Sequence, residues 1–229
     1  METNSRIEVL NKISQYILSL QLHHPVRVGV DGITASGKSS FVSELSDLLR
    51  LSHRKVIATT LDGFHNPRIK RYERGRESAE GYYYDAYNYN EIIKQLLAPL
   101  GEGGSLLFKT QIFDLKTDEP IELKPSKMTV NSVLIVDGSF ALRNELQQYW
   151  DVGIYLKVDC HIAEERAALR DSNDFGSFNE AKRITQVRYH RAHKIHSEIA
   201  RPEDIATFVI CNNNPMCASI LTSKYEMNS

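Results

Sequence analysis

Short apolar runs alternate along the chain with longer segments of helical periodicity. The apolar runs are rich in β-branched residues, which predicts buried strands, and they lie at residues 26–30, 56–61, 133–136, 154–158 and 206–210. Helical patterns lie at residues 38–51, 90–97, 142–149, 162–170 and 179–199. This alternation predicts an α/β fold, in which a parallel β-sheet is flanked by helices on both faces and ligands bind at the carboxyl ends of the strands.

Three further segments differ from this alternation. Residues 1–24 carry apolar positions near helical spacing, interrupted by charges, which predicts a packing helix rather than a secretory signal or a membrane span. Short β-prone pieces around a turn at residues 105–130 predict a hairpin that projects from the main sheet. Residues 212–229 are polar and are expected to form a partly frayed tail. We expect residues 1–229 to form a single domain.

A phosphate-binding sequence follows the first predicted strand directly. It matches the pattern G-x-x-x-x-G-K-[ST], with one further serine after it, and it is typical of a P-loop NTPase. We expect the triphosphate of ATP to bind at Gly32, Ile33, Thr34, Ala35, Ser36, Gly37, Lys38, Ser39 and Ser40. The two glycines allow backbone N–H groups to point at phosphate oxygens, Lys38 adds a charge between the β- and γ-phosphates, and the Ser39 hydroxyl can bind Mg²⁺.

Two aspartates are predicted to lie at the same edge of the sheet as this loop. Asp62 follows the second predicted strand, and Asp137 follows the third. A carboxylate after a buried strand commonly holds Mg²⁺ in phosphate-loop enzymes, which makes Asp137 a metal ligand together with Ser39. The alternative for both aspartates is a structural role, as a helix cap or turn at Asp137 and as an Asp-Gly turn at Asp62.

Aromatic residues gather after Asp62. His65 follows it closely, and residues 80–89 contain five tyrosines, including Tyr83 and Tyr84, beside Asp85. Aromatic faces can hold a sugar or a base while a carboxylate accepts hydrogen bonds from hydroxyl groups. Although tyrosines more often pack than bind ligands, the group together predicts an acceptor pocket.

A basic helical segment precedes a polar, glycine-containing stretch. Arg166 and Arg170 are four residues apart and therefore share a helix face, and residues 166–180 are predicted to form a lid over the triphosphate. The arginines could stabilise the charge that develops on the transferring phosphoryl group. A solvated helix face with Glu–Arg pairs is the alternative.

Composition and charge restrict the partners. The formal net charge of −1 gives no support for a nucleic-acid or membrane partner, so we expect a small-molecule acceptor and ATP. The three cysteines show no paired metal-ligand spacing, and so low a count suits the reducing cytoplasm. Homo-oligomerisation is left open.

Six motifs in this order resemble the uridine kinase and phosphoribulokinase family. They are GITASGKSS, LDGFHNPR, EGYYYDAYNY, IFDLKTDEP, LIVDGSFALR and RAALRD. The resemblance implies that Asp62 is the general base for the acceptor hydroxyl, that Asp85 lies near the ribose hydroxyls and that Phe113 lines a base pocket. Arg166 and Arg170 would be lid arginines, and Asp137 would stand where many relatives carry a glutamate.

Two departures from the family pattern concern specificity and charge. The hairpin lacks the histidine that helps to read the pyrimidine, because residues 115–118 read LKTD. A second pair of lid arginines is also missing, so Arg183 or Arg188 becomes a further candidate for stabilising transition-state charge.

The leading hypothesis is an ATP- and Mg²⁺-dependent kinase that phosphorylates uridine or cytidine to the 5′-monophosphate. A kinase with the same machinery acting on pantothenate, a sugar phosphate or another alcohol is the first alternative. A nucleotide-binding regulatory switch is the second, although such a switch needs neither Asp62 nor an aromatic acceptor region.

Overall fold

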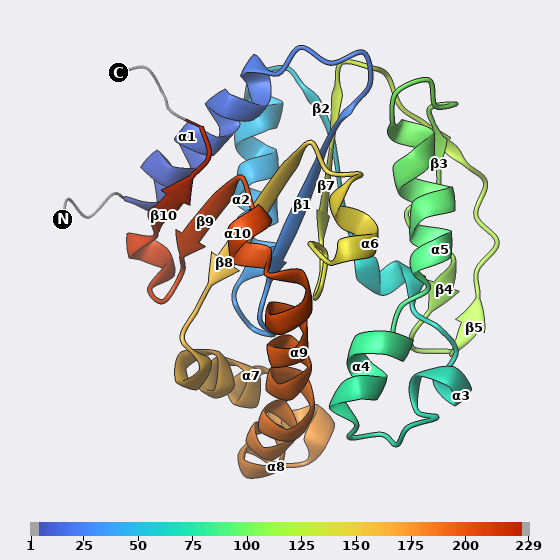
Figure 1. The fold of residues 1–229 in the computed structure, drawn as a ribbon, viewed down its shortest axis with the longest axis vertical. Helices are drawn as coiled ribbons and strands as arrows, with labels where there is room; N and C mark the ends of the chain where they lie inside the picture. The colour runs from blue at the N-terminus through green and yellow to red at the C-terminus, as the bar shows by residue number, and fades with distance from the viewer. Residues whose placement is uncertain (1–4, 226–229) are drawn as a thin grey trace.

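A mostly parallel sheet of six strands forms the centre of the molecule in the computed structural model, which describes residues 5–225 (Figure 1). The strand order is β10-β9-β8-β1-β7-β2, and only β10 is antiparallel to its neighbour. The strands are β1 (Val26–Gly32), β2 (Lys55–Thr60), β7 (Ser132–Asp137), β8 (Val152–Lys157), β9 (Phe208–Cys211) and β10 (Ser219–Ser223). The predicted parallel α/β sheet is therefore confirmed.

Burial on both faces explains why the strands read as continuous apolar runs. Every residue of β1 and β7 is buried, as is usual for parallel strands covered by helices on both sides. One face packs on α1 (Arg6–Ser19) and α2 (Lys38–Leu51). The helix α1 lies within the predicted N-terminal packing segment, of which residues 1–4 are outside the described residues.

The remaining helical segments form two groups along the chain, and the second face of the sheet packs on residues between 61 and 100, on Leu146 and on Ala192 from these groups. The first group is η1 (Leu61–Phe64), α3 (Arg68–Arg71), α4 (Ala79–Asp85), α5 (Tyr89–Ile92), η2 (Ile93–Leu97), η3 (Ala98–Leu100) and α6 (Asn144–Gln147). The second group is α7 (Cys160–Phe175), α8 (Phe178–Ile184), the π-helical η4 (Thr185–His190), α9 (Arg191–Ala200) and α10 (Pro202–Ile205). Within residues 5–225, no helix is long and apolar enough to cross a membrane.

Residues 105–130 form two short antiparallel pairs outside the main sheet. The strand β3 (Leu107–Phe108) pairs with β6 (Ser126–Lys127), and β4 (Phe113–Asp114) pairs with β5 (Glu119–Pro120). Because β4 and β5 lie between β3 and β6 in sequence, the second pair is nested within the first.

The structure corrects two boundaries. The helix predicted at residues 142–149 is reduced to α6, because the indole N–H of Trp150 donates a 2.7 Å hydrogen bond to the carbonyl of Ala141 and the flanking residues form turns. The tail predicted to fray contains the 3₁₀ turn η5 (Pro215–Cys217) and the edge strand β10, while residues 226–229 lie outside the described part of the chain. The polar composition of β10 concealed it, since an edge strand needs little apolar burial.

Candidate active site

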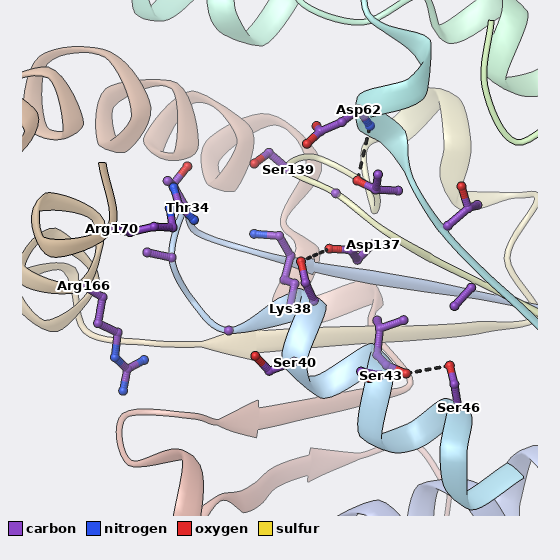
Figure 2. Close-up of a pocket in the computed structure, with 18 of the residues that line it drawn as sticks. Thr34, Lys38, Ser40, Ser43, Ser46, Asp62, Asp137, Ser139, Arg166 and Arg170 are labelled. Atoms are coloured by element: carbon purple, nitrogen blue, oxygen red, sulfur yellow. Dashed lines mark hydrogen bonds between the residues drawn. The ribbon is translucent and has the colours of Figure 1, made fainter. Parts of the chain in front are cut away.

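The phosphate-binding sequence forms a loop between β1 and α2 that needs both of its glycines. Gly32 has a φ of 153°, and a Cβ added there would lie 2.6 Å from the carbonyl oxygen of Leu156. Gly37 has a φ of 89° and caps α2, and its added Cβ would lie 2.8 Å from the side-chain nitrogen of Asn212. The loop residues 34, 35 and 37–40 line a cleft of about 810 Å³ at the carboxyl edge of the sheet (Figure 2).

Lys38 is held inside the loop. Its ammonium donates hydrogen bonds to the carbonyl oxygens of Gly32 at 2.8 Å and Ile33 at 3.1 Å. Burial lowers the pKa of Lys38, and the carboxylates of Asp31, Asp137 and Asp62 oppose that shift. An ammonium that donates its hydrogen bonds to neutral carbonyls within residues 5–225 is well placed to exchange them for phosphate oxygens.

Ser39 and Asp137 meet at the first turn of α2. The Ser39 hydroxyl donates a 2.9 Å hydrogen bond to Oδ2 of Asp137, which ends β7. Burial raises the pKa of Asp137, while the hydrogen bond from Ser39 and the charge of Lys38 oppose the shift. A hydroxyl and a carboxylate at this spacing are the oxygen donors that Mg²⁺ prefers, so the pair fits the predicted metal.

Asp62 lies across the cleft from the loop, in η1 after the end of β2. Its side chain is 56% exposed, and the Tyr87 hydroxyl donates a 3.1 Å hydrogen bond to its Oδ1. His65 Nδ1 donates to the Asp62 main-chain carbonyl at 3.0 Å. Burial lowers the pKa of His65, although the charge of Asp62 opposes this shift. The lowered pKa favours the neutral form of the imidazole. The Asp62 carboxylate is therefore oriented but still open to a ligand.

The aromatic residues divide between the cleft and the core. Tyr82 and Tyr87 line the cleft. Tyr83 is 1% exposed and packs edge-on against Phe140 in the core, so its predicted contact with a substrate is wrong. The helical turn of α4 explains the difference, because neighbouring positions on a helix point in different directions. The sequence alone did not tell which tyrosine faces the cleft.

Three other residues that were predicted to bind the acceptor substrate do not line the cleft. Asp85 binds Arg74 through a 2.7 Å contact between its Oδ2 and the guanidinium Nε. Tyr84 is 46% exposed and packs on Tyr83. Phe113 is buried in β4. The structure therefore does not bring the residues predicted to read a ribose and a base together around Asp62.

Both predicted lid arginines extend from α7 and line the cleft (Figure 2). The Arg166 guanidinium donates to the carbonyl oxygens of Asn212 and Asn213. Arg170 forms a bidentate pair with Asp171, with N–O distances of 2.6 and 2.8 Å. The helix predicted at residues 162–170 is longer in the structure, because α7 continues to Phe175 and ends at Gly176, which has a φ of 82°.

Two residues that sequence reasoning missed hold the loop in place. Asn212 follows β9, and its side-chain amide donates a 2.7 Å hydrogen bond to the carbonyl oxygen of Ser36. Asp31, in β1, accepts hydrogen bonds from the main-chain N–H groups of Gly32 at 2.6 Å and Leu142 at 2.7 Å. Their positions at the carboxyl ends of strands were the signal that could have identified them.

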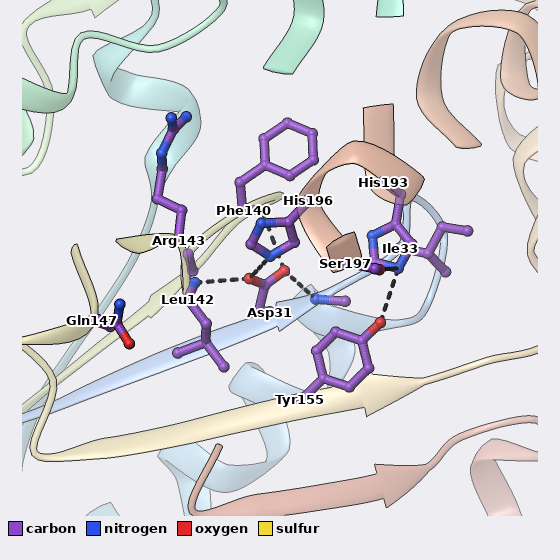
Figure 3. A network of polar contacts seen from close by, with 12 residues as sticks. Asp31, Ile33, Phe140, Leu142, Arg143, Gln147, Tyr155, His193, His196 and Ser197 are labelled. Atoms are coloured by element: carbon purple, nitrogen blue, oxygen red, sulfur yellow. Dashed lines mark hydrogen bonds and ion pairs between the residues drawn. The ribbon is translucent and has the colours of Figure 1, made fainter. Parts of the chain in front are cut away.

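A buried Asp–His pair extends this network to α9 (Figure 3). His196 is completely buried and donates from Nε2 to Oδ2 of Asp31 at 2.9 Å. His193, one helical turn earlier, accepts a 2.8 Å hydrogen bond at Nε2 from the Tyr155 hydroxyl. Burial lowers the pKa of His193 to about 3, so its imidazole is neutral near pH 7. The loop, the segment after β7 and α9 are thus tied together by polar groups, of which Asp31 and His196 are completely buried.

Because burial lowers the pKa of His193, we predict that acid destabilises the fold through this residue. Between pH 6.5 and about 3, the imidazole binds a proton in the unfolded chain but not in the folded one. The free energy of unfolding should therefore fall with falling pH, by about 1.4 kcal/mol per pH unit from this group. Urea unfolding from pH 7 to pH 4 should show a shallower decline for His193→Gln. The exposed His161→Gln variant is the control, and equal slopes for all three proteins would contradict the prediction.

Comparison with known proteins shows what the chain is similar to. The model of the phosphoribulokinase/uridine kinase family matches residues 27–212. The chain is 26% identical over 157 residues to uridine-cytidine kinase B of Dictyostelium discoideum, and 27% identical over 162 residues to the phosphoribulokinase of Synechocystis sp.. These alignments cover 67% and 69% of this chain but only 61% and 46% of the two relatives.

A solved structure extends the comparison to the fold. The structure described as a possible uridine kinase from Bacillus stearothermophilus superposes with a TM-score of 0.69 at 22% identity. The superposition covers 89% of this chain and 97% of the other. At this identity the likeness concerns the fold alone.

Proposed function

The chain belongs to the phosphoribulokinase/uridine kinase family, and on that basis we propose that it transfers the γ-phosphoryl group of ATP to a hydroxyl group of a small molecule. One observation carries the proposal. The phosphate loop with Lys38 and the partly exposed carboxylate of Asp62 line the same cleft. The loop provides a site for the donor, and Asp62 provides a base for an acceptor.

The side chains suggest how the reaction would proceed. Asp62 would accept the proton of the attacking hydroxyl, while the hydrogen bond from Tyr87 holds the carboxylate in place. Lys38 would leave the carbonyls of Gly32 and Ile33 for the β- and γ-phosphates. Arg166 and Arg170 would meet the charge that develops on the phosphoryl group. Mg²⁺, held by Ser39 and Asp137, would neutralise phosphate charge.

Uridine or cytidine is the acceptor that the family resemblance favours. Uridine-cytidine kinase B is among the relatives of this chain, and Tyr82 and Tyr87 offer aromatic faces beside Asp62. A pure regulatory switch would bind ATP without needing a carboxylate on the acceptor side. A different acceptor, in which the hydroxyl belongs to an anionic molecule, is supported by the buried Arg188, whose Nε has no hydrogen-bond acceptor among the described residues.

The acceptor can be identified by coupled measurement of ADP release. The panel contains uridine, cytidine, pantothenate and sugar phosphates, each with ATP and Mg²⁺. Phosphorylation of any of these alcohols, confirmed by mass spectrometry of the product, would support the kinase. ATP binding without acceptor-dependent ADP release across the panel would favour the regulatory switch instead.

A further inference from the structure

Arg188 is a buried cation without a partner for its charge. It belongs to η4, and the residue is only 8% exposed. The guanidinium carbon lies 5.2, 5.1 and 5.3 Å from the ring centroids of Tyr72, Tyr82 and Tyr189. Within residues 5–225 its side chain forms no hydrogen bond or ion pair, and its Nε is fully buried without an acceptor. Such burial is costly, because tyrosine faces replace only part of the lost hydration.

The other buried arginines show that this chain normally pairs such groups. Arg6, Arg27, Arg71 and Arg143 are also buried, and each contacts a carboxylate, with N–O distances between 2.5 and 3.1 Å. Arg143 is the nearest match to Arg188, since it also lies over two tyrosine rings, but it additionally forms a bidentate pair with Glu145. Among the described residues, Arg188 is therefore the exception.

Arg188 lies at the acceptor side of the cleft. It lies over the ring of Tyr82, which lines the cleft, and the Tyr82 hydroxyl donates to Oγ of Ser139, another lining residue, at 3.3 Å. His65, whose Nδ1 is 4.0 Å from the Asp62 carboxylate, is also close enough for the positive charge of Arg188 to contribute to lowering its pKa. Arg188 thus lies next to Tyr82, which lines the same cleft as Asp62.

We propose that Arg188 binds an anionic group of the acceptor, a phosphate or a carboxylate, and that the substrate is therefore an anionic alcohol. This inference rests on the proposed kinase function and specifies its substrate class. The planar guanidinium can bind either anion through two parallel hydrogen bonds. The surrounding tyrosines exclude water, which strengthens the interaction. A neutral nucleoside would leave the charge unpaired, so the site discriminates against it.

The test compares acceptors that differ in their anionic group. Ribose is paired with ribose 5-phosphate, and glycerol with glycerate, so the two pairs distinguish a phosphate from a carboxylate. In the wild-type protein, kcat/KM should be at least about tenfold higher for the anionic member of one pair. Arg188→Gln should lower that value by about 10- to 100-fold and leave KM for ATP unchanged. Arg188→Lys should recover only part of the lost kcat/KM, because an ammonium cannot form the two parallel hydrogen bonds of a guanidinium.

Arg201→Gln is the matched control. Arg201 follows α9, and it is exposed and already paired with Asp204. This variant should retain the preference for the anionic acceptor. Equal use of charged and neutral acceptors, or a rise of KM for ATP alone in Arg188→Gln, would overturn the inference while the kinase function stands.

If no acceptor in the panel is phosphorylated, that result counts against the kinase function. A binding measurement then tests the anion site by itself. Isothermal titration of ribose 5-phosphate, glycerate and inorganic phosphate uses protein saturated with a non-hydrolysable ATP analogue, so that the phosphate loop is occupied. Binding that weakens at least about tenfold in Arg188→Gln, with an unchanged melting temperature, would support an anion site. Absent binding, or equal binding by both proteins, would overturn it.

Discussion

Replacing Lys38 by alanine should reduce turnover by about a hundredfold or more. The ammonium is the only side-chain cation of the phosphate loop, and in the structure it is held by two carbonyl oxygens that phosphate oxygens can replace. Loss of one such preorganised donor costs about 3 to 4 kcal/mol of transition-state stabilisation in comparable sites. Steady-state rates of ADP release with saturating acceptor would measure the loss.

The fold should tolerate this substitution. Burial lowers the pKa of Lys38, which means that the folded protein holds this charge less favourably than water does, so loss of the ammonium should cost little stability. Thermal unfolding should therefore show a melting temperature close to that of the wild type. Lys157→Ala, which removes an exposed lysine paired with Glu203, is the control for loss of a positive charge. Wild-type turnover by Lys38→Ala would contradict the assignment of the donor site.

Local sequence patterns were sufficient to predict the parallel strands of the sheet, though not its antiparallel edge strand β10. The strands β1 and β7 are buried on both faces, and such strands must be apolar at nearly every position. The phosphate loop was also readable from the sequence, because its glycines are required by backbone conformation and close contact rather than by distant partners. Where the backbone conformation dictates the residue type, a single sequence is enough to predict the local structure.

The acceptor side was harder to predict, because it depends on the direction of each side chain. Tyr82 lines the cleft whereas Tyr83 lies in the core, although the two are neighbours in the same helix. The motif that contains Asp85 predicted a place near the ribose hydroxyls, but in the structure its carboxylate is paired with Arg74. The isolation of Arg188 is a property of tertiary packing, since it requires knowledge of every possible partner. No periodicity contains that information.

Replacing Asp62 by asparagine should reduce kcat by about 10²- to 10⁴-fold and leave ATP affinity nearly unchanged. Asparagine keeps the size of the side chain and can still accept a hydrogen bond from Tyr87, but it cannot take a proton from the acceptor hydroxyl. The donor site should be unaffected, since no hydrogen bond joins Asp62 to the phosphate loop among the described residues. Single-turnover rates and ATP titrations on the same preparations would separate the two effects.

Tyr87→Phe separates the base from the group that orients it. This variant removes the hydroxyl that donates to Asp62 but keeps both the carboxylate and the aromatic ring, so its kcat should fall by less than that of Asp62→Asn. If Asp62 only shaped the turn in η1, asparagine would serve equally well, since it is a common turn residue. Activity would then persist in Asp62→Asn, and the base would have to be sought elsewhere in the cleft.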